Sequence, residues 1–317
     1  MQDRCLYCYE PLAPAEVDYH SRCSKKMFGT SAPPMMPYDE HQLDELALQV
    51  VRSQVAVTGV QAKLSLHLEQ PKRRLEPQRF TIVGLWGGYI LKPPSVNYQQ
   101  LPEIEDLTMH LAGAMKIATV PHCLIRMSSG TLAYLTRRID RSGTGKLHME
   151  DMCQLTERLT EDKYHGSYEQ IAKVIRRYSV NPGLDVINFF EMVLFSFLTG
   201  NADMHLKNFS LLDLPGRGYG LAPAYDMLAT ELVNPADTEE LALTLNGKKR
   251  RIGLQDFQQA FKSNGIDDKV QNRMFMRFQN AIPAWERLIE NSLLEPMLKA
   301  SYQNLIRSKF SQLGLKT

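Results

Sequence analysis

Alternating apolar and polar positions, the pattern of half-buried strands, occur mainly before residue 140. This pattern and short apolar runs predict strands over residues 64–68, 80–83, 89–92 and 132–136. Apolar residues at helical spacing predict helices over 39–53 and 102–116 in the same half of the chain. The first half is therefore expected to be rich in strands.

Helical spacing dominates after residue 154. Residues 167–178 form one expected helix, with Ser167 as its N-cap and Gln170 at the capping-box position. Residues 185–199 are apolar on most faces, so this second helix is expected at the centre of a helical layer. Several more helices are expected after residue 230. Strands followed by helices predict an α+β fold.

The composition suits a protein with a buried core and either one large domain or two lobes. The chain has 317 residues, of which 44% are hydrophobic. We expect a small Cys/His segment at 1–30, a strand-rich lobe at 31–153 and a helical lobe at 154–317. The net charge of +2 gives no electrostatic reason to expect direct binding to nucleic acid or to a membrane surface.

The expected location is the cytoplasm. The longest apolar run, 186–198, is too short to span a bilayer, and the N-terminus lacks the apolar core of a secretory signal. Five cysteines are an odd number, which argues against a disulfide framework and for a reducing compartment.

Four metal-ligand residue types lie within the first 23 residues. Cys5 and Cys8 form one close pair, and His20 and Cys23 form another. Two such pairs separated by a loop are typical of a structural zinc site, in which four protein ligands leave no position for chemistry. The alternative is that these cysteines are simply buried in reduced form.

A stretch from Gly200 to Thr230 contains Asp203, Asn208 and Asp226. We interpret the segment after Asn208 as a β-hairpin whose tip lies near residues 216–218. Folding it about Arg217 places Asn208 opposite Asp226, with Asp203 on the loop that leads into the first strand.

Phosphoryl transfer from Mg-ATP requires such a set of side chains. An aspartate orients and deprotonates the acceptor hydroxyl, while an asparagine and a second aspartate hold Mg²⁺. Ordinary turn chemistry is the alternative, since Asn and Asp favour loops.

The stretch resembles the N-x-D-x-H-x-x-N…P-x-Y-D pattern of the HipA family of bacterial toxin kinases. The matching residues are Asn201, Asp203, His205, Asn208, Pro223, Tyr225 and Asp226. The resemblance implies a two-lobed protein-kinase-like fold, with Asp203 as the catalytic base and with Asn208 and Asp226 as Mg²⁺ ligands. It includes His205 in the catalytic loop, where that residue either positions the loop or is purely structural.

Residues before 155 add further similarities to this family. V-T-G-V-Q-x-K-L-S at 57–65 resembles its phosphate loop, which implies that Lys63 and the loop residues Thr58, Gly59, Val60 and Gln61 contact ATP. I-L-K-P-P at 90–94 resembles the strand that carries the phosphate-binding lysine. By the same resemblance Lys92 contacts phosphates and pairs with Glu105. Residues 148–154 resemble the hinge, with adenine received at the backbone of Glu150 and Met152.

One departure from the family concerns regulation. The family's regulatory serine precedes the phosphate loop, and this chain has Ala56 at that position. The hydroxyl residue two positions on is Thr58. Autophosphorylation, if it occurs, is therefore expected on Thr58, where added charge would repel the phosphates of ATP. The alternative is that Thr58 is only a turn residue whose hydroxyl bonds the backbone.

The family resemblance implies a serine/threonine protein kinase of a toxin–antitoxin system. Its expected substrate is a cellular protein, such as an aminoacyl-tRNA synthetase, whose phosphorylation arrests growth. With 54 residues before residue 55, the chain resembles the short, HipT-like type. The implied partners are a small antitoxin similar to the missing N-terminal subdomain and a DNA-binding repressor. Two alternatives remain: a small-molecule kinase with the same metal site, and a non-catalytic pseudokinase that binds an antitoxin or repressor.

Overall fold

The structure, a computed structural model, describes residues 3–43, 45–46, 63–69, 78–83, 87–142 and 145–316. The chain divides into two compact units. Unit 1 comprises Met1–Asp106, Val120–Ile139 and Asn291–Leu294. Unit 2 comprises Leu107–Thr119, Asp140–Glu290 and Glu295–Thr317.

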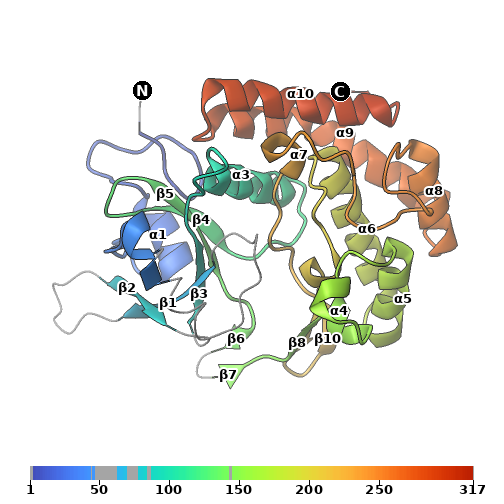
Figure 1. The fold of residues 1–317 in the computed structure, drawn as a ribbon, viewed down its shortest axis with the longest axis horizontal. Helices are drawn as coiled ribbons and strands as arrows, with labels where there is room; N and C mark the ends of the chain where they lie inside the picture. Colours follow the sequence, from blue (N-terminus) through green and yellow to red (C-terminus); the bar gives the residue numbers. More distant parts are fainter. Residues whose placement is uncertain are drawn as a thin grey trace. The chain divides into compact units, whose positions relative to one another are not determined.

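Unit 1 contains the antiparallel sheet expected from the alternating pattern (Figure 1). Its elements are α1 (Ser21–Phe28), β1 (Leu64–Glu69), β2 (Arg79–Val83), β3 (Tyr89–Lys92), the first turns of α3 (Leu101–Ala114), β4 (His122–Arg126) and β5 (Leu132–Arg137). The strand order is β2-β1-β3-β5-β4, so β1 lies between β2 and β3. The apolar face of the sheet is buried because the alternating leucines, such as Leu64 and Leu66, point to one side.

Aromatic side chains close the core of unit 1. The rings of Phe80 and Tyr89 meet edge to face with centroids 5.2 Å apart, and Phe28 of α1 packs on Phe80 at 6.1 Å. The N-terminal segment is thereby part of unit 1 rather than a separate domain.

Unit 2 is mainly helical (Figure 1). Its elements are the remainder of α3, β6 (Arg141–Ser142), β7 (Gly145–Lys146), β8 (Met149–Asp151), α4 (Met152–Leu155), η1 (Thr160–Asp162), α5 (Tyr168–Tyr178), α6 (Pro182–Leu198), η2 (Leu206–Asn208), β9 (Ser210–Leu214), β10 (Gly218–Leu221), α7 (Thr230–Val233), α8 (Leu254–Ser263), most of α9 (Asp268–Asn291) and α10 (Pro296–Gln312). Strands β10, β9 and β8 form a small antiparallel sheet in that order.

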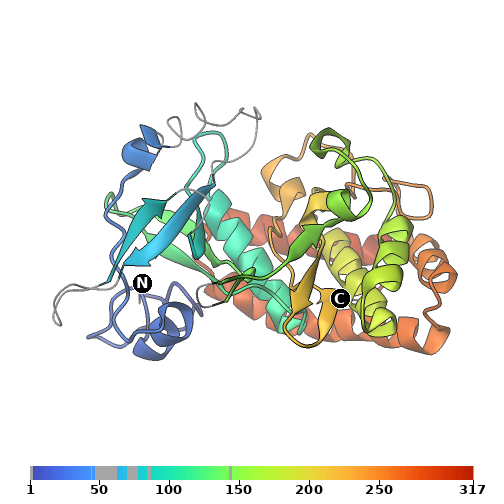
Figure 2. The same cartoon turned by 90° about the horizontal axis from the view of Figure 1, so that it is seen from below.

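Helix α6 is the centre of unit 2, as its uniformly apolar sequence predicts. It lies beside α5 (Figure 2). The ring of Phe189 meets that of Phe209 at 5.0 Å, and Phe195 meets Trp285 of α9 at 5.6 Å. Because α6 is held on several sides, the loop that follows it starts from a fixed point.

Most expected elements are present within a few residues of their predicted ends. Ser167 caps α5, and the reciprocal bonds with Gln170 confirm the predicted capping box. The helix expected from residue 39 is seen at 40–43 and 45–46; its remainder lies outside the described residues. Strand β4 was not expected from the sequence.

The boundary between the units differs from the expected one at residues 153 and 154. After β5 the chain returns to unit 2 at Asp140, and β8 lies in this helical unit because it pairs with β9. Among the described residues, no helix is long and apolar enough to cross a membrane.

Candidate active site

The loop after α6 is fixed by backbone geometry and by buried polar contacts. Gly200 has φ +68°, and a Cβ there would approach the Leu305 side chain within 2.7 Å, so this turn requires glycine. Asn201 is fully buried and its Oδ1 accepts the Asp203 backbone N–H at 3.3 Å. The Thr230 hydroxyl accepts the Ala202 N–H at 2.8 Å. The backbone around Asp203 is therefore held by contacts on both sides.

Asp203 carries an exposed carboxylate at this loop. Its Oδ1 accepts a hydrogen bond of 2.7 Å from the hydroxyl of Tyr164, a residue on the segment between η1 and α5. Burial, and secondly this bond, raise the pKa of Tyr164, so the hydroxyl stays protonated as a donor. Among the described residues Oδ2 has no hydrogen-bond partner, which leaves one carboxylate oxygen open to solvent or to a substrate.

His205 lies beneath this pair. Its ring is buried and meets the Tyr164 ring edge to face, with centroids 5.0 Å apart. Burial lowers the pKa of His205, an effect that the nearby Asp203 charge opposes. Within the described part of the chain, Nδ1 has no hydrogen-bond partner. The histidine therefore supports Tyr164 by packing.

Asn208 and Asp226 meet as predicted. Asn208 Nδ2 donates to Asp226 Oδ2 at 3.1 Å, while Asn208 Oδ1 accepts the His205 backbone N–H at 3.3 Å. Asn208 is buried, whereas Asp226 is half-buried. Asp226 has φ +60°, a left-handed conformation that Asp tolerates better than most residues. This backbone turn directs its carboxylate toward Asn208.

The hairpin register differs slightly from the expected one. Leu214 pairs with Gly218 and Leu211 with Leu221, so the hairpin is centred on Gly216 rather than on Arg217. In this register Asp226 lies beyond the end of β10, where its backbone is left-handed, and it still contacts Asn208. The predicted proximity is confirmed although the predicted register is off by one position.

The structure adds contacts that the sequence pattern does not indicate. Lys207 Nζ binds Asp151 Oδ2 at 2.7 Å, which attaches the loop between Asp203 and Asn208 to the end of β8. The Tyr225 hydroxyl donates to the Lys207 carbonyl at 3.0 Å and contacts the Ser210 hydroxyl at 2.5 Å. Tyr225 thereby clamps the chain before Asp226 onto the loop that carries Asn208.

The expected adenine-binding positions, Glu150 and Met152, have backbone groups that pair within unit 2. The Met152 N–H donates to the Phe209 carbonyl at 3.0 Å, and the Met152 carbonyl accepts from Thr156. Glu150 pairs with Leu211, and the alternation of antiparallel bonds directs its backbone groups toward β9. The backbone groups on the outer edge of β8 are therefore those of Met149 and Asp151, one residue away from the expected positions.

In unit 1, Lys92 and Glu105 form the expected ion pair. Lys92 Nζ contacts Glu105 Oε1, and both side chains are almost fully buried. Lys92 Nζ also lies 5.4 Å from the centre of the Tyr134 ring, its partner across β3 and β5. A buried charge pair with a supporting ring holds the lysine in one position.

Of the residues expected to contact ATP from the phosphate loop, the structure describes Lys63. Lys63 is exposed and directly precedes β1. Thr58, Gly59, Val60 and Gln61, together with Ala56, lie outside the described residues.

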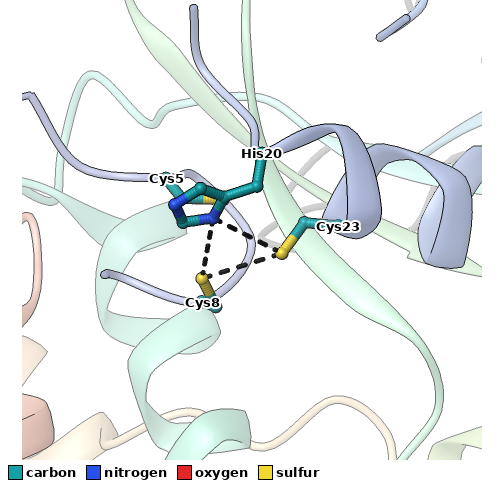
Figure 3. Close-up of side chains that lie close together, drawn as sticks. All are labelled: Cys5, Cys8, His20 and Cys23. Atoms are coloured by element: carbon teal, nitrogen blue, oxygen red, sulfur yellow. Dashed lines mark hydrogen bonds between the residues drawn. The ribbon is translucent and has the colours of Figure 1, made fainter. Parts of the chain in front are cut away.

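The four predicted zinc ligands converge in unit 1 (Figure 3). One donor atom from each of Cys5, Cys8, His20 and Cys23 lies within 4.8 Å of all the others. The three cysteines of this set are free thiols and form no disulfide. The arrangement is that of a closed ligand set.

Curated proteins with similar sequences come from two bacteria. "Putative kinase Y4dM" of Sinorhizobium fredii is 33% identical over 255 residues, covering 76% of this chain and 60% of that protein. "Putative kinase" of Haemophilus influenzae is 28% identical over 62% of this chain and 58% of that protein. The chain thus spans about three fifths of the length of these relatives.

Solved structures of other proteins share the fold. The Shewanella oneidensis HipA, solved in a toxin–antitoxin complex with HipB and operator DNA, matches with TM-score 0.70 at 19% identity, over 88% of this chain and 72% of that one. The Helicobacter pylori proinflammatory kinase CtkA matches with TM-score 0.52 at 14% identity, over 71% and 87%. These similarities confirm the predicted α+β, kinase-like fold.

The family assignment rests on the sequence match itself. Residues 55–285 match the family described as HipA-like C-terminal domain, and this range includes Asp203, Asn208 and Asp226. Since the match covers most of the chain, the protein belongs to the HipA-like C-terminal domain family.

Proposed function

We propose that the chain is a kinase that transfers the γ-phosphoryl group of Mg-ATP to a serine or threonine hydroxyl of a protein. The observation that carries this proposal is the arrangement in unit 2. One fixed loop presents the Asp203 carboxylate to solvent, and the hairpin after it brings Asn208 within 3.1 Å of Asp226. Phosphoryl transfer depends mainly on positioning of the reactants and on neutralisation of charge. In this proposal Asp203 positions the acceptor hydroxyl, and Asn208 and Asp226 hold the ion that neutralises charge.

Asp203 is the proposed base. Tyr164 holds Oδ1, so the carboxylate has a fixed orientation, and Oδ2 is left to accept the proton of an acceptor hydroxyl. His205 acts as a positioning residue, because it packs against Tyr164 and has a pKa lowered by burial.

Asn208 and Asp226 fit the needs of Mg²⁺. This ion binds oxygen ligands and is usually held by one or two carboxylates together with phosphates. The pair offers the Asp226 carboxylate and the Asn208 amide oxygen, and a hydrogen bond from Asn208 Nδ2 to Asp226 Oδ2 holds the two side chains together. When bound, the ion would neutralise charge on the transferring phosphoryl group.

Unit 1 supplies the proposed phosphate contacts. The ion pair with Glu105 holds the Lys92 ammonium in place. A lysine binds phosphates as a compact point charge, so a fixed position favours this contact. Lys63 and the loop residues Thr58, Gly59, Val60 and Gln61 complete this set by resemblance to the family.

The family suggests a biological role for the chain in a toxin–antitoxin system. We propose that the chain is the toxin of a toxin–antitoxin pair and acts in the cytoplasm, with antitoxin proteins as partners. The solved structure of HipA with HipB and operator DNA shows such an assembly for a protein of the same fold.

The test is phosphoproteomic. The purified chain and its Asp203→Asn variant are incubated with Mg-ATP and cell extract, and phosphorylation sites are mapped by mass spectrometry. New phosphoserine or phosphothreonine on a protein, seen only with the unchanged chain, is the expected result. Phosphate found only on small molecules would replace the protein acceptor by a metabolite. Metal-dependent nucleotide binding without any transfer would instead identify a pseudokinase.

A further inference from the structure

We infer that Cys5, Cys8, His20 and Cys23 bind one zinc ion, and that this centre positions Glu105 through Tyr9 and Asp106. The first part concerns the N-terminal segment alone. The second part rests on the proposed function, because Glu105 is the partner of the proposed phosphate-binding lysine.

The distances between the ligand atoms suit a tetrahedral ion (Figure 3). Cys8 Sγ and Cys23 Sγ lie 3.7 Å apart, and His20 Nδ1 lies 3.4 and 3.7 Å from them. Zinc–sulfur bonds of about 2.3 Å in a tetrahedron place two sulfurs about 3.8 Å apart. Three thiol groups and an imidazole are the donors that zinc prefers in closed structural sites.

The orientation of His20 provides independent support. Its Nε2 lies 3.0 Å from the Pro11 carbonyl, which can only accept, so Nε2 carries the proton. In the neutral ring Nδ1 is then the unprotonated nitrogen, and it faces the sulfurs of Cys8 and Cys23. A histidine whose second nitrogen donates to a carbonyl is the usual arrangement of a zinc ligand.

The backbone between the first two cysteines also forms a built turn. The Cys5 N–H donates to the Glu10 carbonyl at 3.0 Å, and the Tyr9 N–H donates to the Cys5 carbonyl at 2.9 Å. Tyr9, directly after Cys8, has φ +61°. A bulky residue in this left-handed region costs about 1–3 kcal/mol and persists only where the surroundings hold it. A metal bound by its neighbour Cys8 would supply that hold.

The same tyrosine connects the ligand cluster to α3. The Tyr9 hydroxyl donates to Asp106 Oδ2 at 2.6 Å, and Asp106 Oδ1 lies 2.7 Å from His122 Nδ1 on β4. Asp106 is fully buried, and the preceding residue is Glu105, which contacts Lys92. The cluster therefore fixes the turn of α3 on which Glu105 lies.

A second connection attaches the segment to β4. The Leu124 N–H donates to the Leu6 carbonyl at 3.0 Å, and the Tyr19 hydroxyl donates to the Leu124 carbonyl at 2.5 Å. Apart from α1, residues 3–30 have little regular structure of their own. Short segments of this kind commonly depend on a metal for their conformation.

The first experiment measures metal in the purified full chain. We expect about one zinc per chain, as structural sites of this type bind, and release of that zinc after a thiol reagent is added. Cys8→Ser should lose zinc, whereas Cys153→Ser, a change of a buried cysteine in unit 2, should retain it. A zinc-free unchanged chain, or equal zinc in both variants, overturns the site; neither result depends on kinase activity.

The second experiment tests the connection to Glu105. Tyr9→Phe removes only the hydroxyl, so zinc content should be unchanged, and the Kd for a non-hydrolysable Mg-nucleotide should rise about tenfold, as expected for loss of one hydrogen bond to a charged group. In a Lys92→Met background the same change should alter Kd by less than about twofold, because the two residues act in series.

Three outcomes would contradict the connection. Unchanged affinity of Tyr9→Phe overturns it, and so does an equal effect of Tyr9→Phe in both backgrounds. If the unchanged chain binds no nucleotide, the proposed function fails together with the connection, while the zinc measurement still stands.

Discussion

The Tyr164 hydroxyl donates a 2.7 Å hydrogen bond to Asp203 Oδ1, across 39 positions of the chain. This contact orients the carboxylate that we assign as the base, and the edge-to-face packing of His205 orients Tyr164 in turn. The proposed base is thus held by a residue that lies outside the sequence motif.

Tyr164→Phe should lower kcat and leave KM for ATP unchanged. The phenylalanine keeps the ring that packs on His205 but removes the bond that orients Asp203, so we expect a loss of about tenfold in kcat, typical of a hydrogen bond to a charged group. Steady-state phosphorylation of a mapped substrate measures it. Tyr178→Phe, an exposed tyrosine at the end of α5, is the control. Equal rates for both variants would exclude Tyr164 as a positioning residue.

Asp226→Asn should abolish Mg²⁺-dependent nucleotide binding with little loss of stability. Asparagine tolerates φ +60° as well as aspartate does, but it lacks the charge that a divalent cation requires. Asp226→Ala should in addition lose about 1 kcal/mol of stability from backbone strain. Nucleotide titration at several Mg²⁺ concentrations, together with thermal unfolding, separates the two effects. Asp213→Asn on β9 serves as the matched control, and an equal effect there would contradict the assignment.

Glu105→Leu should destabilise the protein by about 3 kcal/mol, because it removes the carboxylate that a buried ammonium contacts. The double variant Lys92→Met, Glu105→Leu should recover most of that stability, since two apolar side chains then occupy the site. It should not recover nucleotide affinity if Lys92 binds phosphates. Chemical denaturation and nucleotide titration measure the two properties. A double variant that binds nucleotide normally would exclude Lys92 from the site.

Asp256→Asn should cost about 1.5–3 kcal/mol at neutral pH, the range for hydrogen bonds to a charged group. Burial alone would raise the pKa of Asp256, but the Gly253 N–H, Lys248 and Asn246 bind its carboxylate and together lower that pKa. Because its pKa is lowered in the folded state, the Asp256 carboxylate stabilises the fold when the pH is above the pKa of an unfolded Asp, about 3.9. This stabilisation is lost as the pH falls below that value and the carboxylate becomes protonated.

The unfolding free energies of Asp256→Asn and of the unchanged chain should therefore converge in acid. Denaturant unfolding between neutral pH and about pH 3 measures this, around the reference value for Asp. A constant difference across that range would contradict the linkage.

The basic run at 248–251, for which the sequence suggests no function, has structural contacts: Lys248 binds Asp256, and Lys249 binds Glu239.

Local sequence determined several features correctly. Side-chain periodicity and turn residues specify α5 with its Ser167 cap, the apolar α6 and the β9–β10 hairpin, because these depend on neighbours within a few positions. Asn208 and Asp226 are also close in the sequence, and so are the four N-terminal Cys and His residues, which is why the chain pattern predicted that each set would meet.

Long-range partners required the tertiary structure. Tyr9 and Asp106 are 97 positions apart, and Lys207 and Asp151 are 56 apart. The order β2-β1-β3 and the outward-facing edge of β8 likewise depend on which strands pair. Such contacts depend on how the whole core is buried, which no local spacing encodes. The residue types of the proposed site can, by contrast, be read directly from the chain.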